Sequence, residues 1–125
     1  MARLHKSTYA TQLRALVRNG KGPQEIMDRL LVSALIELRS YERFVLLAHA
    51  CEDAELSRFY ETLAGSEVGH YKVFLELAGQ ARPAAEVEAR WQEMLQAESR
   101  IIQKEPPGHG IHSGVMAPQT SNVAS

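Results

Sequence analysis

The sequence predicts an all-α protein built as an antiparallel helical bundle. Three observations support this fold class: apolar residues recur at three- and four-residue spacing over long segments, glycine, proline or aspartate stands between those segments, and no segment shows the strict alternation of a β-strand. The 125 residues are enough for one core, and a content of 45% hydrophobic and 23% charged residues is typical of a folded globular chain.

The first predicted helix is short and runs from Thr8 to Asn19. Asn19 and Gly20 are typical of a helix end, and the following Gly22-Pro23 breaks the chain before the next helix begins. The apolar positions of this helix are Leu13, Leu16 and Val17. The stretch before Glu25, the first acidic residue, is basic, because it contains Arg3, Lys6, Arg14, Arg18 and Lys21.

Two long helices follow and form the predicted antiparallel pair. The first, from Gln24 to about Ala50, is apolar nearly all round and therefore requires cover on several sides. The chain turns near Cys51 and Glu52, and Asp53 is expected to cap the second long helix, which ends at Gly79.

A fourth helix follows Pro83 and ends before Pro106. Glu98 interrupts its apolar stripe, and we interpret it as a boundary residue rather than a further inward carboxylate. Residues 105–125 are rich in Gly, Ser and Pro and predict a flexible tail, so the helical domain covers residues 1–104. His109 and His112 fall in this tail, where we expect no ligand role.

Hydropathy and cysteine content exclude several classes of protein. No apolar stretch is long enough to cross a bilayer, and no export leader follows Met1, so we expect no membrane partner. The single cysteine, Cys51, cannot form an internal disulfide, which fits a reducing cytoplasm.

Polar residues interrupt the apolar stripe of the second long helix. Glu67 and His70 are three residues apart and in line with the stripe, so both side chains are predicted to point into the bundle from adjacent turns. A buried carboxylate is costly unless it is paired, and a metal ion is one partner that compensates it. Ferritin-like di-metal bundles use this Glu-x-x-His arrangement. By itself the motif is short, and a hydrogen-bonded Glu/His pair is the alternative.

The height of each residue above the turn selects a second carboxylate. Glu67 lies about 15 residues beyond the turn, or roughly 22 Å along the axis, and Glu37 lies about 14 residues before it, or roughly 21 Å. Glu42 is only about 10 residues before it, or roughly 15 Å. We therefore predict Glu37, Glu67 and His70 as metal ligands. Arg39 and Glu42, with Arg43, are candidates for a second layer around them or for salt bridges.

Several stretches of sequence resemble the MiaE family of tRNA hydroxylases, which act on 2-methylthio-isopentenyl-adenosine next to the anticodon. The stretches are LVSALIELRSYERF from Leu31 to Phe44, the RFY that begins at Arg58, SEVGHY from Ser66 to Tyr71, and IHSG from Ile111 to Gly114. The resemblance covers most of the chain, from about Thr8 to Val115. It implies a ferritin-like bundle whose non-haem di-iron centre uses O₂ and an electron donor to hydroxylate the isopentenyl group.

The family pattern carries over residue by residue, with departures. Glu37, Glu67 and His70 fall on the expected iron ligands of the second helix pair. Tyr41 stands where the family usually has Cys, and Val68-Gly69 replaces its Ala-Arg. The family's upstream helix pair, with its own Glu and Glu-x-x-His, has no counterpart in this sequence, so the expected architecture is half of a bundle with half of the ligand set.

Three explanations of the missing half remain open: a homodimer that supplies a second ligand set, a separate chain that carries the upstream helix pair, or a fragment without activity. The enzyme hypothesis is a di-iron tRNA monooxygenase, and the alternative is a metal-binding or structural helical module without turnover. On the first hypothesis Arg14, Arg18 and Lys21 are candidate contacts to tRNA phosphates; a solvated basic helix face is the simpler alternative.

Overall fold

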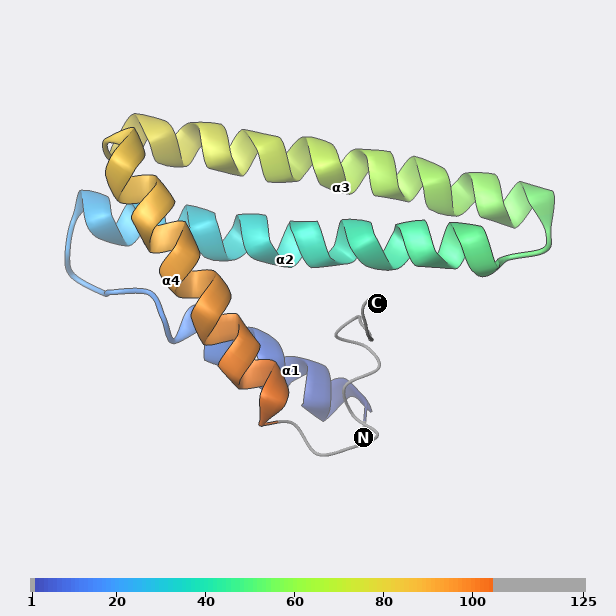
Figure 1. Ribbon diagram of the computed structural model, residues 1–125, viewed down its shortest axis with the longest axis horizontal. Helices are drawn as coiled ribbons and strands as arrows, with labels where there is room; N and C mark the ends of the chain where they lie inside the picture. Colours follow the sequence, from blue (N-terminus) through green and yellow to red (C-terminus); the bar gives the residue numbers. More distant parts are fainter. Residues whose placement is uncertain (1, 105–125) are drawn as a thin grey trace.

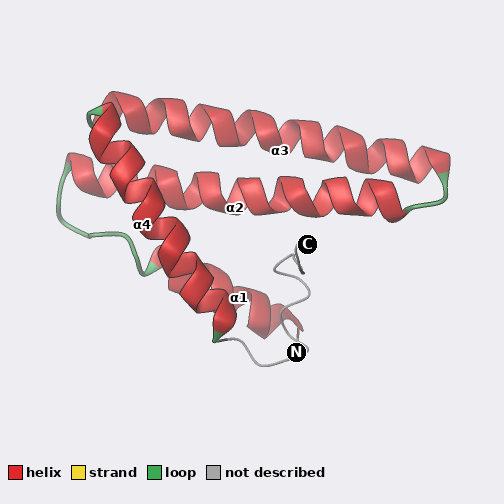
Figure 2. Ribbon diagram, in the orientation of Figure 1, coloured by secondary structure: helices red, strands yellow, loops and turns green. Residues whose placement is uncertain are grey.

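The computed structural model describes residues 2–104, with side chains from residue 8 onward. Within this range the chain forms four helices and no strand, which confirms the all-α prediction (Figure 2). The helices are α1 (Ala2–Arg14), α2 (Pro23–Ala50), α3 (Ala54–Ala81) and α4 (Ala84–Gln103). None of the described helices is long and apolar enough to span a membrane. The predicted tail, with His109 and His112, lies outside the described residues.

The helices α2 and α3 form a long antiparallel hairpin (Figure 1). The chain reverses at residues 51–53, as predicted, and Asp53 caps α3 by accepting a 3.0 Å hydrogen bond from the Leu56 backbone N–H. The Ser57 hydroxyl donates a 2.8 Å hydrogen bond to the Ala48 carbonyl across the turn. These contacts set the register of the two helices, which decides which residues of α2 and α3 face each other.

The helices α1 and α4 cover the hairpin only near its open end. In Figure 1, α4 leaves the end of α3 and crosses α2, and α1 lies beside the lower part of α4. The core is found where these helices meet the first half of α2, and it consists of Leu13, Val17, Met27, Leu31, Val32, Leu35, Ala78, Met94 and Ile101. Toward the turn, α2 keeps Leu46 and Leu47 exposed. The expected cover on several sides is therefore confined to the first half of this helix.

The first helix differs from its prediction at both ends. It begins at Ala2 and ends at Arg14, whereas the sequence predicted a helix from Thr8 to Asn19. At the C-terminal end the reason lies in tertiary structure: Asp28 accepts a 3.0 Å hydrogen bond from the Arg18 backbone N–H, which takes that group out of the helix. Gly20 and Gly22 then adopt positive φ angles of 79° and 60° in the loop before α2.

A buried ion cluster joins α2 to α4 and to the loop after α1. The Asp28 side chain is fully buried, and it accepts hydrogen bonds of 2.9 Å from Arg18 Nε and 3.0 Å from Arg90 Nε. Burial raises the pKa of Asp28, but the hydrogen bonds from the two arginines outweigh it, and the net pKa is lowered. Arg90 also donates a 2.7 Å hydrogen bond to the Leu16 carbonyl, so this arginine ties α4 both to Asp28 of α2 and to the backbone that follows α1.

A second buried cluster corrects the interpretation of Glu98. This residue is only 2% exposed, so it is not a boundary residue. It accepts a 2.6 Å hydrogen bond from the Tyr9 hydroxyl and 2.8 and 2.7 Å bonds from Arg39. Burial first, and then the charge of Glu98, raise the pKa of Tyr9. The carboxylate is buried because α1 and α2 each bring a donor to it, and periodicity along α4 contains no information about those donors.

Candidate metal centre

Glu37, Glu67 and His70 come together on one face of the hairpin. Each offers one donor atom, and the three atoms lie within 4.8 Å of one another. His70 Nδ1 is 3.0 Å from Glu37 Oε1 and 3.6 Å from Glu67 Oε1. The structure therefore brings together all three of the residues that the sequence predicted as ligands.

The hairpin register explains this convergence. Glu67 and His70 occupy adjacent turns of α3, and the reversal at residues 51–53 puts Glu37 of α2 at the same height. The side chains of the two glutamates are each 23% exposed, whereas the imidazole of His70 is 61% exposed. The cluster therefore lies partly between the helices and opens outward on the side of His70.

The electrostatics of the cluster favour a cation. The hydrogen bond between Glu67 and Glu37, then burial and the charge of Glu37, raise the pKa of the Glu67 carboxyl, and His70 opposes them only in part. Two carboxylates held this close repel each other when both are ionised. A divalent cation bound between them would relieve that repulsion.

The donor set also fits a first-row transition metal. Carboxylate oxygen and imidazole nitrogen are ligands that such metals accept. Neighbouring donors on one metal ion, with bonds of about 2.1 Å, stand about 3 Å apart, and the His70 and Glu37 donor atoms are 3.0 Å apart here. Three donors leave the coordination shell of a single ion unfilled, so the cluster can hold a metal while keeping positions for other ligands.

Arg39 and Glu42 lie apart from the donor cluster. Arg39 Nη1 donates to both oxygens of Glu42 at 3.0 Å, and the remaining nitrogens of this guanidinium bond Glu98. Their positions two and five residues after Glu37 turn both side chains toward the far side of α2. The structure supports the salt-bridge interpretation of this pair. The contacts described here for Arg39 and Glu42 are with each other and with Glu98, and none of them is to a residue of the donor cluster.

The three candidate RNA contacts differ in their surroundings. Arg14 and Lys21 are exposed. Arg18 is 37% exposed in its side chain, but its guanidinium is paired with Asp28 at 2.9 Å. Because that charge is already neutralised, the free cationic charge of this segment rests on Arg14 and Lys21 among the described residues.

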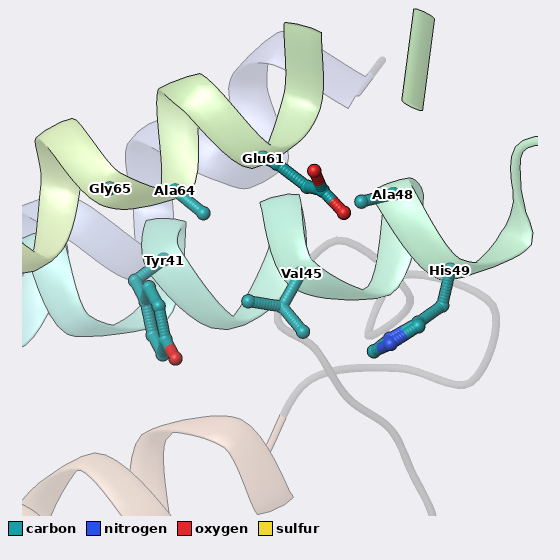
Figure 3. Close-up of a pocket in the computed structure, with 7 residues that line it drawn as sticks. All are labelled: Tyr41, Val45, Ala48, His49, Glu61, Ala64 and Gly65. Atoms are coloured by element: carbon teal, nitrogen blue, oxygen red, sulfur yellow. The ribbon is translucent and has the colours of Figure 1, made fainter. Parts of the chain in front are cut away.

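A groove on the α2–α3 hairpin near the turn does not include the donor cluster. It has a volume of about 290 Å³, and Figure 3 shows its lining. Four of the lining residues come from α2 and three from α3: Tyr41, Val45, Ala48, His49, Glu61, Ala64 and Gly65. Since Glu37, Glu67 and His70 are absent from this lining, the groove and the donor cluster are separate features.

The fold and the site together define a helical carboxylate–histidine protein, in which a helix pair carries two glutamates and a histidine as a candidate metal-binding group. The comparison with protein families then gives the family. Residues 1–113 match the family described as tRNA-(MS[2]IO[6]A)-hydroxylase (MiaE). The chain belongs to this family.

Two relatives are named tRNA 2-(methylsulfanyl)-N(6)-isopentenyladenosine(37) hydroxylase. The protein of Pseudomonas putida is 42% identical over 108 residues, which cover 86% of this chain and 51% of the relative. The protein of Salmonella typhimurium is 37% identical over 111 residues, which cover 89% of this chain and 40% of the relative. The chain thus spans about half of the length of these relatives or less. No solved structure matches it.

Proposed function

We propose that this chain carries half of the metal centre of a tRNA hydroxylase, a non-haem di-iron monooxygenase acting on the isopentenyl group of 2-methylthio-isopentenyl-adenosine. The observation that supports it most is the convergence of Glu37, Glu67 and His70 within 4.8 Å in a chain of the MiaE family. Both relatives are named for hydroxylation of this tRNA nucleoside, which supports the substrate class.

In this proposal Glu37, Glu67 and His70 hold iron. When bound, iron supplies the redox chemistry that activates O₂, and two electrons from an unidentified donor with two protons balance the insertion of one oxygen atom and the release of the other as water. The chain's own contribution is to hold two carboxylates and an imidazole close together, so that a cation offsets the repulsion between the carboxylates. The hairpin also keeps the three donors at fixed spacing before metal arrives, which lowers the cost of ordering them.

A di-iron centre needs more protein ligands than this hairpin offers. Three donors serve one ion with open positions, whereas ferritin-like centres take ligands from two helix pairs. The proposed enzyme therefore includes a second helix pair, from either a second copy of this chain or a separate polypeptide. Its tRNA is expected to contact Arg14 and Lys21 through phosphates, with a smaller share for Arg18. With a tRNA substrate and a single free cysteine, we place the enzyme in the cytoplasm.

Anaerobic loading with Fe²⁺ tests the metal centre. We expect about one iron per chain for the wild type and loss of binding in Glu67→Gln, because the amide cannot replace an anionic ligand. Glu76→Gln is the matched control, since Glu76 is an exposed glutamate on the same helix outside the cluster. Equal loading of all three proteins would overturn the ligand assignment.

Hydroxylation is tested with tRNA from cells that make the unhydroxylated nucleoside, followed by nucleoside mass analysis. A gain of one oxygen atom that depends on iron, O₂, reductant and Glu67 supports the enzyme. The openness of the cluster favours a second candidate, a metal-binding helical module without turnover. Tight iron binding with no product in any combination of partners would favour that module.

A further inference from the structure

The donor cluster lies in the middle of a stripe of apolar residues along α3 that is exposed at both ends. Leu56, Leu63, His70 and Leu77 follow one another at seven-residue spacing, which keeps them on one face of the helix. Leu56 and Leu77 are 42% and 41% exposed, and the neighbouring Phe59 is 55% exposed. This face of α3 is therefore apolar at both ends and carries the imidazole at its centre.

A matching stripe runs along α2. Leu30, Glu37 and Phe44 follow at seven-residue spacing, and Ile26, eleven residues before Glu37, extends the same face at the start of the helix. Ile26 is 53% exposed. Both helices thus place apolar residues on either side of the donors, as in the seam of a helical bundle whose other half is absent from the described chain.

Leu46 is an exposed apolar residue of α2 that does not belong to the stripe. It is 57% exposed, but it lies nine residues after Glu37, which puts it on the opposite side of α2. The stripe is therefore a directional feature centred on the donors, and Leu46 supplies an internal reference of equal exposure.

We infer that this face docks on the same face of a second copy of the chain, so that two sets of Glu37, Glu67 and His70 meet at a two-fold axis. The inference rests on the proposed metal centre and names its partner. A two-fold axis that passes close to the cluster places the donor set of one copy opposite that of the other. Because apolar residues extend in both directions from the donors, the same axis also packs the apolar stripes of one copy against those of the other. The pair then offers four carboxylates and two imidazoles, which balance the charge of two divalent ions.

The stripe argues against other occupants. Nucleic acid is disfavoured, because the centre of the face holds two acidic side chains and its ends are apolar. A single helix would cover only one of the two stripes. The occupant must be two helices wide and bring donors at matching heights, and the α2–α3 hairpin of a second copy meets both requirements by symmetry.

Light scattering combined with Co²⁺ absorption tests the inference on the full chain. We expect a molar mass of twice the 13.9 kDa of one chain and two Co²⁺ per pair. Ile26→Glu, and separately Phe59→Glu, should halve the molar mass and weaken Co²⁺ binding by more than about tenfold, although neither removes a donor. Leu46→Glu is the matched control and should change neither quantity. Circular dichroism checks that the helix content of each variant is preserved.

The outcomes separate this inference from the proposed function. A wild-type monomer that binds Co²⁺ through Glu67 and His70 would overturn the dimer and leave the metal centre intact. A dimer broken by Ile26→Glu that binds no metal would overturn the metal centre and keep the seam. A monomer that gains its ligands only from a polypeptide matching the rest of the relatives' length would overturn the second copy as occupant. A dimer broken equally by Leu46→Glu would contradict the seam.

Discussion

Two regions of this molecule handle charge in opposite ways. At the junction of α1, α2 and α4, Asp28 is fully buried and Glu98 is 2% exposed, and each is bonded to arginines of the same chain. On the outer face of α2 and α3, Glu37 and Glu67 have each other and His70 as partners, and the imidazole is 61% exposed. The first region uses charge to join helices, whereas the second holds charge that a cation can satisfy.

The contrast teaches how to separate structural from functional carboxylates in a small helical protein. The hydrogen bonds of Arg18 and Arg90 lower the pKa of Asp28, whereas the hydrogen bond to Glu37 raises the pKa of Glu67. A carboxylate whose partners already favour its ionised form stabilises the fold. A carboxylate held beside another carboxylate is a cost to the fold unless a ligand arrives.

The largest expected effect comes from a substitution in the Glu37–Glu67–His70 cluster. His70→Ala should abolish iron binding, because it removes the only nitrogen donor of the cluster, while the helix content stays the same since the imidazole is mostly exposed. Iron per chain and circular dichroism measure the two quantities. His49→Ala, at an exposed histidine of α2, should leave iron binding unchanged. Retention of iron by His70→Ala would place the metal elsewhere.

The next largest effect is expected from a substitution in the buried Asp28 cluster. Asp28→Asn should lower the free energy of unfolding by about 3 kcal/mol, because it leaves two arginines partly buried without their anion. Urea denaturation of both proteins measures the difference. Glu25→Gln, a surface pair on the same helix, should give a much smaller change. A loss no larger than that of the control would mean that the cluster contributes little to the fold.

The stabilising effect of Asp28 should also depend on pH. Since the folded-state pKa of Asp28 lies below its ordinary value of 3.8, its stabilising effect is present above about pH 4 and is lost as the pH falls through the folded-state pKa. The stability difference between wild type and Asp28→Asn should therefore shrink below pH 4. A difference that stays constant down to pH 2 would contradict the assignment.

A smaller effect concerns the Glu98 cluster. Tyr9→Phe should cost about 1–2 kcal/mol, since it removes one hydrogen bond to a buried carboxylate that keeps both bonds from Arg39. Thermal unfolding measures it, with Tyr41→Phe in the open groove as control. If the two variants unfold at the same temperature, the bond to Glu98 adds nothing to stability.

The smallest effect concerns RNA. Arg14→Ala with Lys21→Ala should weaken tRNA binding and reduce the slope of log affinity against log salt by about one to two, because two exposed cations are removed. Filter binding at several salt concentrations measures the slope. An unchanged slope would mean that these residues are only a solvated face.

Much of the geometry of the candidate metal centre was predictable from the sequence because helices are regular. Seven- and three-residue spacings decide which side chains share a face, and counting from the turn put Glu37 rather than Glu42 opposite Glu67. The cap at Asp53 followed from its residue type. Each of these predictions needed only local geometry and one turn.

Tertiary structure alone decided the contacts between helices distant in sequence. Glu98 is buried by Tyr9 and Arg39, which lie 89 and 59 residues away, and α1 ends early because Asp28 captures the Arg18 backbone N–H. Such partners depend on how α1 and α4 cross α2, which no periodicity along a single helix contains. The sequence by itself determined the number of helices, the faces of the two long ones and the three candidate donors, and the packing of those helices determined which charges became structural and which remained open to a ligand.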